Sequence, residues 1–189
     1  MSASWRMFCA FELPETLRTR IDEHSQRMRA AVPDAAASWS RAEKIHLTLK
    51  FFGNVDPERV PVISATAAQV VKKFSPFPLV VGTSGSFTRR APVLWIGIQD
   101  PSGTLLHLQH LLENECARQG FPTEGRVYRP HLTIARIRKP DNADRLVQAH
   151  LSTQFANEEV TLSELILFRS ELSSKGSKYT AISRQRLEH

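Results

Sequence analysis

Apolar residues along this chain follow two different spacings, one typical of strands and one typical of helices. Between the predicted strands, apolar residues recur at helical spacing, and Pro14 and Pro57 stand where two of the helices begin. Gly120 is expected to cap a third helix. Short apolar runs bounded by turn residues predict strands at 6–12, 38–40, 45–52, 79–87, 93–98, 127–137, 160–169 and 179–184, and helices are predicted at 14–31, 57–73, 102–119 and 141–151.

The order of these elements favours an α+β fold. Helices that follow strands would also suit a parallel sheet, but the short spacings within 79–98 and 160–184 favour antiparallel pairing. The order strand, helix, strand, helix, strand occurs twice, once from Met7 and once from Val93. We therefore expect a bilobal, pseudo-twofold fold with two mainly antiparallel sheets, outer helices and a central cleft.

One tetrapeptide pattern occurs in both halves, 85 residues apart. The first copy is His46-Leu47-Thr48-Leu49 and the second is His131-Leu132-Thr133-Ile134. On a strand alternate side chains share a face, so the histidine and threonine of each copy should point the same way while the residues between them pack inward.

A pair of imidazoles suits a reaction in which one proton is taken and another is given in the same turnover. Histidine has an ordinary pKa near 6.5, so one ring can accept a proton while the other donates one. Displacement at phosphorus needs this arrangement, and the threonine hydroxyls could donate hydrogen bonds to phosphate oxygens. No metal is required. A single histidine of this kind would more often be a hydrogen-bonded core residue; the matched pair favours catalysis.

Composition places limits on the partners and the setting. The chain has 189 residues and a formal net charge of +6, which favours an anionic partner, although a generally basic surface explains the charge equally well. Basic residues are spread out, Arg89 and Arg90 among them, and with only Cys9 and Cys116 present no disulfide scaffold is expected. We expect a cytoplasmic monomer with no membrane partner, a single domain over 1–186, and an expression-tag remnant at 187–189.

The segments around the two histidines resemble a known family. His46-Leu-Thr-Leu-Lys-Phe-Phe-Gly53 and Arg129-Pro-His-Leu-Thr-Ile-Ala-Arg136 are similar to the paired motifs of the 2H phosphoesterase superfamily, and most of all to bacterial RNA 2′,3′-cyclic phosphodiesterases, also described as 2′-5′ RNA ligases. Flanking segments at 6–14, 90–97 and 168–179 extend the resemblance over nearly the whole chain.

The resemblance implies a metal-independent, cofactor-free enzyme that opens a terminal RNA 2′,3′-cyclic phosphate to a 2′-phosphate. It implies that His46 donates a proton to the leaving 3′ oxygen and that His131 accepts one from water. Thr48 and Thr133 would hold the phosphate, and Arg136 matches the arginine of the family motif. Weak 2′-5′ ligation by the reverse reaction is expected as a side activity.

Residues near the two motifs extend the candidate site. Arg136 would face away from His131 on a regular strand, so the strand must end or bulge before it. Lys50 shares the His46 face by alternation and could attract phosphate. Candidate base-stacking aromatic residues are Trp39, Phe52 and Tyr128.

Alternatives of other kinds remain. The chain could be a non-catalytic module that binds RNA ends, or a phosphodiesterase for a small cyclic nucleotide. His107 and His110 lie three residues apart on a predicted helix, but they lack neighbouring ligands and suit an exposed face better than a metal site. His24 and His150 are likewise expected on helix surfaces.

Overall fold

The structure consists of two antiparallel sheets with helices on their outer sides. The computed structural model describes residues 4–87, 92–173 and 176–188. Within these residues the strands are β1 (Trp5–Glu12), β2 (Ala37–Trp39), β3 (His46–Val55), β4 (Phe77–Phe87), β5 (Val93–Gln99), β6 (His131–Ile137), β7 (Glu158–Leu162), β8 (Glu164–Ser173) and β9 (Gly176–Arg186). The helices are α1 (Glu15–Ala31), α2 (Val60–Val71), α3 (Thr104–Arg118) and α4 (Ala143–Ser152), with 3-10 turns η1 (Ala42–Lys44) and η2 (Pro57–Arg59).

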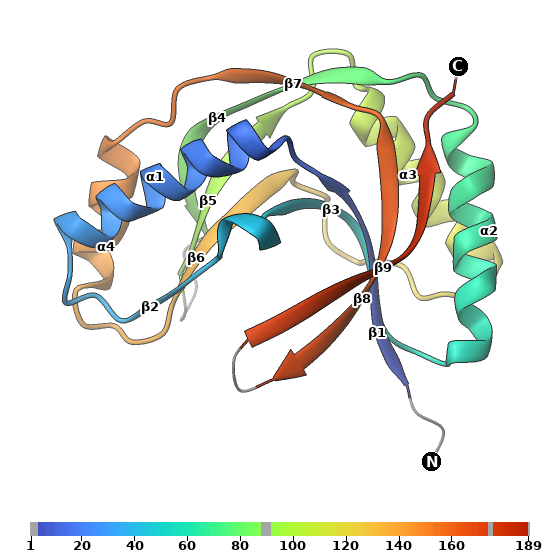
Figure 1. Cartoon of the computed structure of the whole chain (residues 1–189), viewed down its shortest axis with the longest axis horizontal. Helices are drawn as coiled ribbons and strands as arrows, with labels where there is room; N and C mark the ends of the chain where they lie inside the picture. Colours follow the sequence, from blue (N-terminus) through green and yellow to red (C-terminus); the bar gives the residue numbers. More distant parts are fainter. Residues whose placement is uncertain (1–3, 88–91, 174–175, 189) are drawn as a thin grey trace.

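Each sheet contains one of the two histidine strands. One sheet has the strand order β3-β1-β8-β9 and is called the His46 sheet below; the other has the order β2-β6-β5-β4-β7 and is called the His131 sheet. Helices α2 and α3 pack together on the His46 sheet, whereas α1 and α4 pack together on the His131 sheet (Figure 1). The predicted α+β class with two antiparallel sheets and outer helices is therefore confirmed.

The two halves of the chain exchange strands. Strand β4 lies beside β5 in the His131 sheet, and β8 lies beside β1 in the His46 sheet. These two strands occupy matching places in the sequence repeat, so the pseudo-twofold order holds while each sheet takes strands from both halves. The lobes are consequently assembled from distant parts of the chain and do not correspond to its two halves.

Several predicted boundaries were wrong. The strand predicted at 127–137 begins only at His131, and the strand predicted at 160–169 is divided at Ser163 into β7 and β8, which belong to different sheets. Pro57 opens η2, and the α-helix begins at Val60. Strand β3 continues past Gly53, whose φ of 72° accommodates a bulge opposite Met7.

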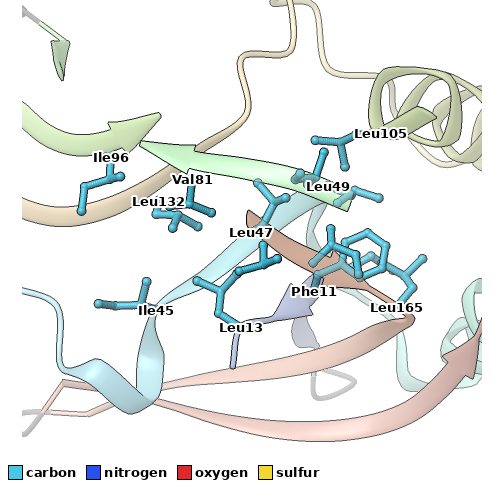
Figure 2. Close-up of a cluster of buried hydrophobic side chains, with 14 of the residues drawn as sticks. Phe11, Leu13, Ile45, Leu47, Leu49, Val81, Ile96, Leu105, Leu132 and Leu165 are labelled. Carbon is cyan, nitrogen blue, oxygen red and sulfur yellow. The ribbon is translucent and has the colours of Figure 1, made fainter. Parts of the chain in front are cut away.

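The core connects the two sheets. Leu47 of β3 and Leu132 of β6 are both 0 % exposed and belong to one cluster with residues of β1, β4 and β5 (Figure 2). These are the residues that separate histidine from threonine in each copy of the pattern. Their inward packing directs His46, Thr48, His131 and Thr133 to the opposite faces of their strands, as alternation requires.

Two helix histidines lie in the interior. His24 of α1 and His150 of α4 are both 0 % exposed, and their Nε2 and Nδ1 atoms are 3.1 Å apart. The prediction that they lie on helix surfaces is therefore wrong, because α1 and α4 face each other at these positions.

Leu187 lies at the C-terminal end of the described residues and is buried. It is 5 % exposed, and its amide donates to the carbonyl of Ser163 at 2.9 Å. His189, Arg89 and Arg90 lie outside the described residues. No helix among the described residues is long and apolar enough to span a membrane.

Candidate active site

Each histidine is the first residue of its strand and is held in the same way. His46 Nδ1 is 2.8 Å from the carbonyl oxygen of Lys44, and His131 Nδ1 is 2.7 Å from that of Arg129. A carbonyl oxygen only accepts, so Nδ1 must donate and the neutral ring has its lone pair on Nε2. No described residue forms a hydrogen bond with either Nε2. Both rings therefore present a nitrogen that can accept or, once protonated, donate a proton.

The segment that leads into each histidine strand is bonded to the other histidine strand. The Ser40 hydroxyl donates to the carbonyl of Thr133 at 2.8 Å, and the Ser40 amide donates to the carbonyl of Ile134 at 2.8 Å. In return, the Tyr128 hydroxyl donates to the carbonyl of Thr48 at 2.9 Å. These reciprocal bonds join the two H-x-T strands at the boundary between the sheets.

The same bulge follows the threonine in both strands. In β3, Lys50 pairs with Cys9 and Thr48 with Ala10, which leaves Leu49 as the extra residue. In β6, Ala135 pairs with Leu94 and Thr133 with Trp95, so Ile134 is the extra residue. A bulge reverses the alternation of side chains beyond it. The residue two positions after each threonine therefore turns away from the face of the histidine, and the residue three positions after it turns onto that face.

In the second copy the bulge turns Arg136 toward His131. Arg136 is exposed while Ala135 is fully buried, and the charge of Arg136 acts on the pKa of His131. The expected bulge is therefore present at the place where Arg136 needs it.

In the first copy the bulge turns Lys50 away from His46, and the prediction that the two share a face is wrong. Lys50 is 3 % exposed, and its Nζ donates to Glu113 Oε1 at 2.7 Å and to the carbonyl of Pro122 at 2.9 Å. Phe51 occupies the matching position of Arg136 and is 46 % exposed. Lys50 therefore connects β3 to α3 and to the segment before β6. Its ammonium group faces away from the site and is no longer a candidate phosphate ligand.

Aromatic side chains contact His46. Its ring stacks on Phe8 with centroids 4.8 Å apart and lies edge to face with Tyr179 at 5.2 Å. Phe168 is a third aromatic neighbour of this ring. Burial lowers the pKa of His46, while the bond to Lys44 and the charge of Glu12 counteract this in part. Glu12 lies directly opposite His46 in the register of β1 and β3.

His131 has an opposite electrostatic setting. Its ring meets Phe87 edge to face at 4.9 Å. Burial lowers the pKa of His131, the bond to Arg129 raises it in part, and the charge of Arg136 lowers it further. Both rings are thus biased toward the neutral form, and the carboxylate lies beside His46 while the guanidinium lies beside His131.

The aromatic residues singled out from the sequence have other contacts than stacking on the two histidine rings. Phe52 is 6 % exposed and packs on Phe121, Trp39 lies under Arg29 of α1, and Tyr128 uses its hydroxyl to bond Thr48. Sequence reasoning missed the residues that do adjoin the histidines. Strand alternation from His46 and His131 could not identify them, since they come from neighbouring strands; they are Phe8, Glu12, Phe87, Phe168 and Tyr179.

The described residues contain no group of three or more histidine, cysteine, aspartate or glutamate side chains placed to hold a metal ion. His107, one of the two helix histidines considered for that role, packs its ring against Phe74 at 5.3 Å.

Comparison with known proteins decides the family. A family model described as the 2′-5′ RNA ligase superfamily matches residues 15–173, a span that includes both H-x-T strands. The chain belongs to this superfamily. The resemblance noted from the two motifs is thereby confirmed.

Relatives of the superfamily are similar over nearly their full length. A protein of Methanothermobacter thermautotrophicus named RNA 2′,3′-cyclic phosphodiesterase is 35% identical over 180 residues, which cover 93% of this chain and 95% of the relative. One of the same name from Escherichia coli is 28% identical over 97% of both chains.

Solved structures share the fold. The crystal structure of TT0787 of Thermus thermophilus matches with a TM-score of 0.82 at 25% identity, over 97% of this chain and all of the other. The crystal structure of E. coli LigT complexed with 3′-AMP matches with a TM-score of 0.78 at 25% identity, over 99% of this chain and all of the other.

Proposed function

We propose that this protein hydrolyses the 2′,3′-cyclic phosphate at the end of an RNA strand to a 2′-phosphate, without a metal ion, by paired-histidine acid–base catalysis. The observation that carries the proposal is the matched state of the two rings. Each is fixed through Nδ1 to a carbonyl, so that its Nε2 is available for proton transfer. The names of the superfamily relatives support RNA cyclic phosphate as the substrate class.

The charged neighbours support a division of roles. Glu12 favours the protonated form of His46, whereas Arg136 favours the neutral form of His131. His46 is accordingly the proton donor and His131 the proton acceptor. This matches the roles that the sequence resemblance implied.

The reaction is an in-line displacement at phosphorus. His131 Nε2 takes a proton from water as the water oxygen forms a bond to phosphorus on one side. The bond between phosphorus and the 3′ oxygen breaks on the other side, and His46 Nε2 gives its proton to that oxygen. The products are a 2′-phosphate and a 3′ hydroxyl, with His46 left neutral and His131 protonated until solvent resets both.

Three side chains would hold the phosphate. The hydroxyls of Thr48 and Thr133 lie on the histidine faces of their strands, and no described residue accepts a bond from either hydroxyl. Arg136 reaches the same face through the bulge. Hydroxyl and guanidinium donors would stabilise the charge that develops on the non-bridging oxygens in the transition state.

The proposal is tested by product analysis on a defined end. An oligoribonucleotide with a 2′,3′-cyclic phosphate is incubated with wild type, His46→Ala and His131→Ala, and the products are separated as 2′- or 3′-phosphates. Wild type should form the 2′-phosphate, and each variant should lose at least about 100-fold in kcat because general acid–base groups contribute roughly that much.

A matched control separates chemistry from folding. His110→Ala removes an exposed histidine of α3 and should leave kcat unchanged, while thermal unfolding should show that the two site variants remain folded. Near wild-type turnover by either folded site variant would contradict the mechanism. So would loss of wild-type activity when divalent metal ions are chelated. Incubation of the cyclic-phosphate oligomer with an RNA that has a 5′ hydroxyl tests 2′-5′ ligation, in which that hydroxyl replaces water, forms the bond to phosphorus and displaces the 3′ oxygen.

A further inference from the structure

A guanidinium that strand alternation did not indicate lies on the His46 side of the site. Arg6 of β1 places its Cζ 4.5 Å from the centroid of the Phe51 ring. Phe51 is the counterpart of Arg136 in the first copy of the bulged strand, and it pairs with Phe8, whose ring stacks on His46. An arginine held on an aromatic face therefore continues the surface that carries His46 and Thr48.

The charge of Arg6 is not neutralised by another described residue. Arg6 is exposed, and no described carboxylate forms an ion pair with it. Arginines 169 and 184, which also belong to the His46 sheet, are by contrast paired with Glu171 and with Glu12 and Glu164. Stacking on Phe51 fixes the guanidinium plane while its N–H groups remain able to bind an anion.

A groove begins at Arg6 and extends the basic and aromatic surface. It has a volume of about 350 Å³ and is lined by Trp5, Arg6, Asn54 and Arg169, together with Ser4, Ser170, Leu172 and Glu171, the carboxylate that pairs with Arg169. The guanidinium of Arg169 lies 4.3 Å from the centroid of the Trp5 ring. The groove thus combines the unpaired Arg6, an arginine that is paired with Glu171 and lies on Trp5, and an amide, a mixture of basic, polar and aromatic groups that suits single-stranded nucleic acid.

We propose that Arg6, held on Phe51, binds the phosphodiester that links the terminal nucleotide to the one before it, and that the adjoining groove receives that preceding nucleotide. The inference rests on the proposed function, since it assigns the path of the RNA strand that enters the same site. Phe51 lies three residues beyond Thr48, roughly 7–10 Å along a strand, which places Arg6 beside the site and not over the reacting phosphorus.

The pseudo-twofold order of the fold supports separate roles for Arg136 and Arg6. The second copy supplies its own guanidinium, Arg136, next to the base His131. The first copy has Phe51 at that position and receives a guanidinium from the neighbouring strand instead. Arg136 would therefore hold the reacting phosphate together with the two threonines, and Arg6 would hold the next phosphate along the strand.

The test compares two substrates that differ only in the preceding nucleotides. Initial rates are measured on a nucleoside 2′,3′-cyclic monophosphate and on an oligoribonucleotide with the same terminal nucleoside and cyclic end. Arg6→Gln and Phe51→Leu should each lower the ratio of kcat/KM for the oligomer to that for the mononucleotide by about tenfold, as expected for loss of one backbone or stacking contact. For Arg6→Gln, the slope of log kcat/KM against log salt on the oligomer should fall by about 0.7.

A control and a binding assay make the outcomes distinct. Arg145→Gln removes an exposed arginine from α4 and should leave the ratio and the salt slope at wild-type values. The Kd of a 2′-phosphate oligomer, relative to that of the 2′-phosphate mononucleotide, gives the same comparison without catalysis. An unchanged ratio in both assays, or an equal loss on both substrates, would overturn the assignment. If wild type hydrolyses neither cyclic substrate, the proposed function fails, and the Kd ratio alone then decides this inference.

Discussion

The two histidines differ mainly in their charged neighbours. Glu12 lies opposite His46 in the β1–β3 register, and Arg136 follows the bulge beyond His131. Each neighbour acts on one ring only, so the pKa values of the two histidines are moved apart although burial lowers both. Separated pKa values are what an acid–base pair needs, because one ring must be protonated while the other is not.

Removing either charge should move one limb of the pH profile. Glu12→Gln removes a charge that raises the pKa of His46, so the alkaline limb of kcat/KM should move to lower pH. Arg136→Gln removes a charge that lowers the pKa of His131, so the acidic limb should move to higher pH. Both limbs are read from kcat/KM, which reports the free enzyme.

Charge-conserving variants serve as controls for these shifts. Glu12→Asp and Arg136→Lys should leave the respective limb near its wild-type position even where they lower the rate. If Glu12→Gln moved the acidic limb instead, His46 would be the base, and the proposed roles would be reversed.

At the scale of single elements, the bulges decide which predictions succeed. The strand and the shared face of the H-x-T residues follow from the sequence pattern, and the need for a bulge before Arg136 follows from the alternation of side chains. The matching bulge at Leu49 could not be foreseen, because it depends on how β3 pairs with β1. Alternation therefore places Lys50 on the wrong face, and it overlooks Phe51 for the same reason.

The reciprocal bonds between the histidine strands should matter for both stability and rate. Tyr128→Phe removes the hydroxyl that donates to Thr48, and Ser40→Ala removes the mirror bond to Thr133. Each should lower the free energy of unfolding by about 1 kcal/mol, the usual net value of one hydrogen bond, and should lower kcat several-fold because the two strands carry the reacting groups.

Urea unfolding and kcat measured on the same preparations check this expectation. Ser152→Ala is the matched control, since its exposed hydroxyl bonds to Ala149 at the end of α4, far along the chain from either strand. A loss of stability without any change in kcat would mean that these bonds support the fold but do not position the histidine pair.

In the complete fold, the exchange of strands between the two halves explains why sheet membership could not be predicted from the order of the elements. The repeat of elements was visible in the sequence, but which sheet each strand joins depends on contacts between residues far apart. The division at Ser163 places β7 in one sheet and β8 in the other, and no local signal distinguishes them. The burial of His24 and His150 escaped prediction for a related reason, since it requires α1 and α4 to meet.

These two buried histidines should make the stability of the His131 sheet depend on pH. His150 Nε2 donates to the carbonyl of Trp95 at 3.0 Å, and its Nδ1 accepts from His24 Nε2 at 3.1 Å, an arrangement that requires the His150 ring to be neutral. Burial lowers the pKa of His24 to about 4, with further lowering by His150 and Arg27, and burial also lowers the pKa of His150. The unfolded chain binds protons below about pH 6.5, whereas the folded chain binds them only at lower pH. Stability is therefore complete above about pH 6.5 and should fall as the pH decreases toward 4.

Replacement of one ring isolates this contribution. His24→Gln keeps a donor near His150 but does not titrate, so the wild type should lose about 1–2 kcal/mol more stability than this variant between pH 7.5 and pH 5. Urea midpoints across that range measure the difference, and His110→Ala, an exposed histidine, should follow the wild-type curve. Parallel curves for wild type and His24→Gln would show that the pair is protonated in the folded state as readily as in the unfolded one. A steeper wild-type curve would instead mean that the contact between α1 and α4, and with it the support beneath Trp95 and Thr133, weakens in acid.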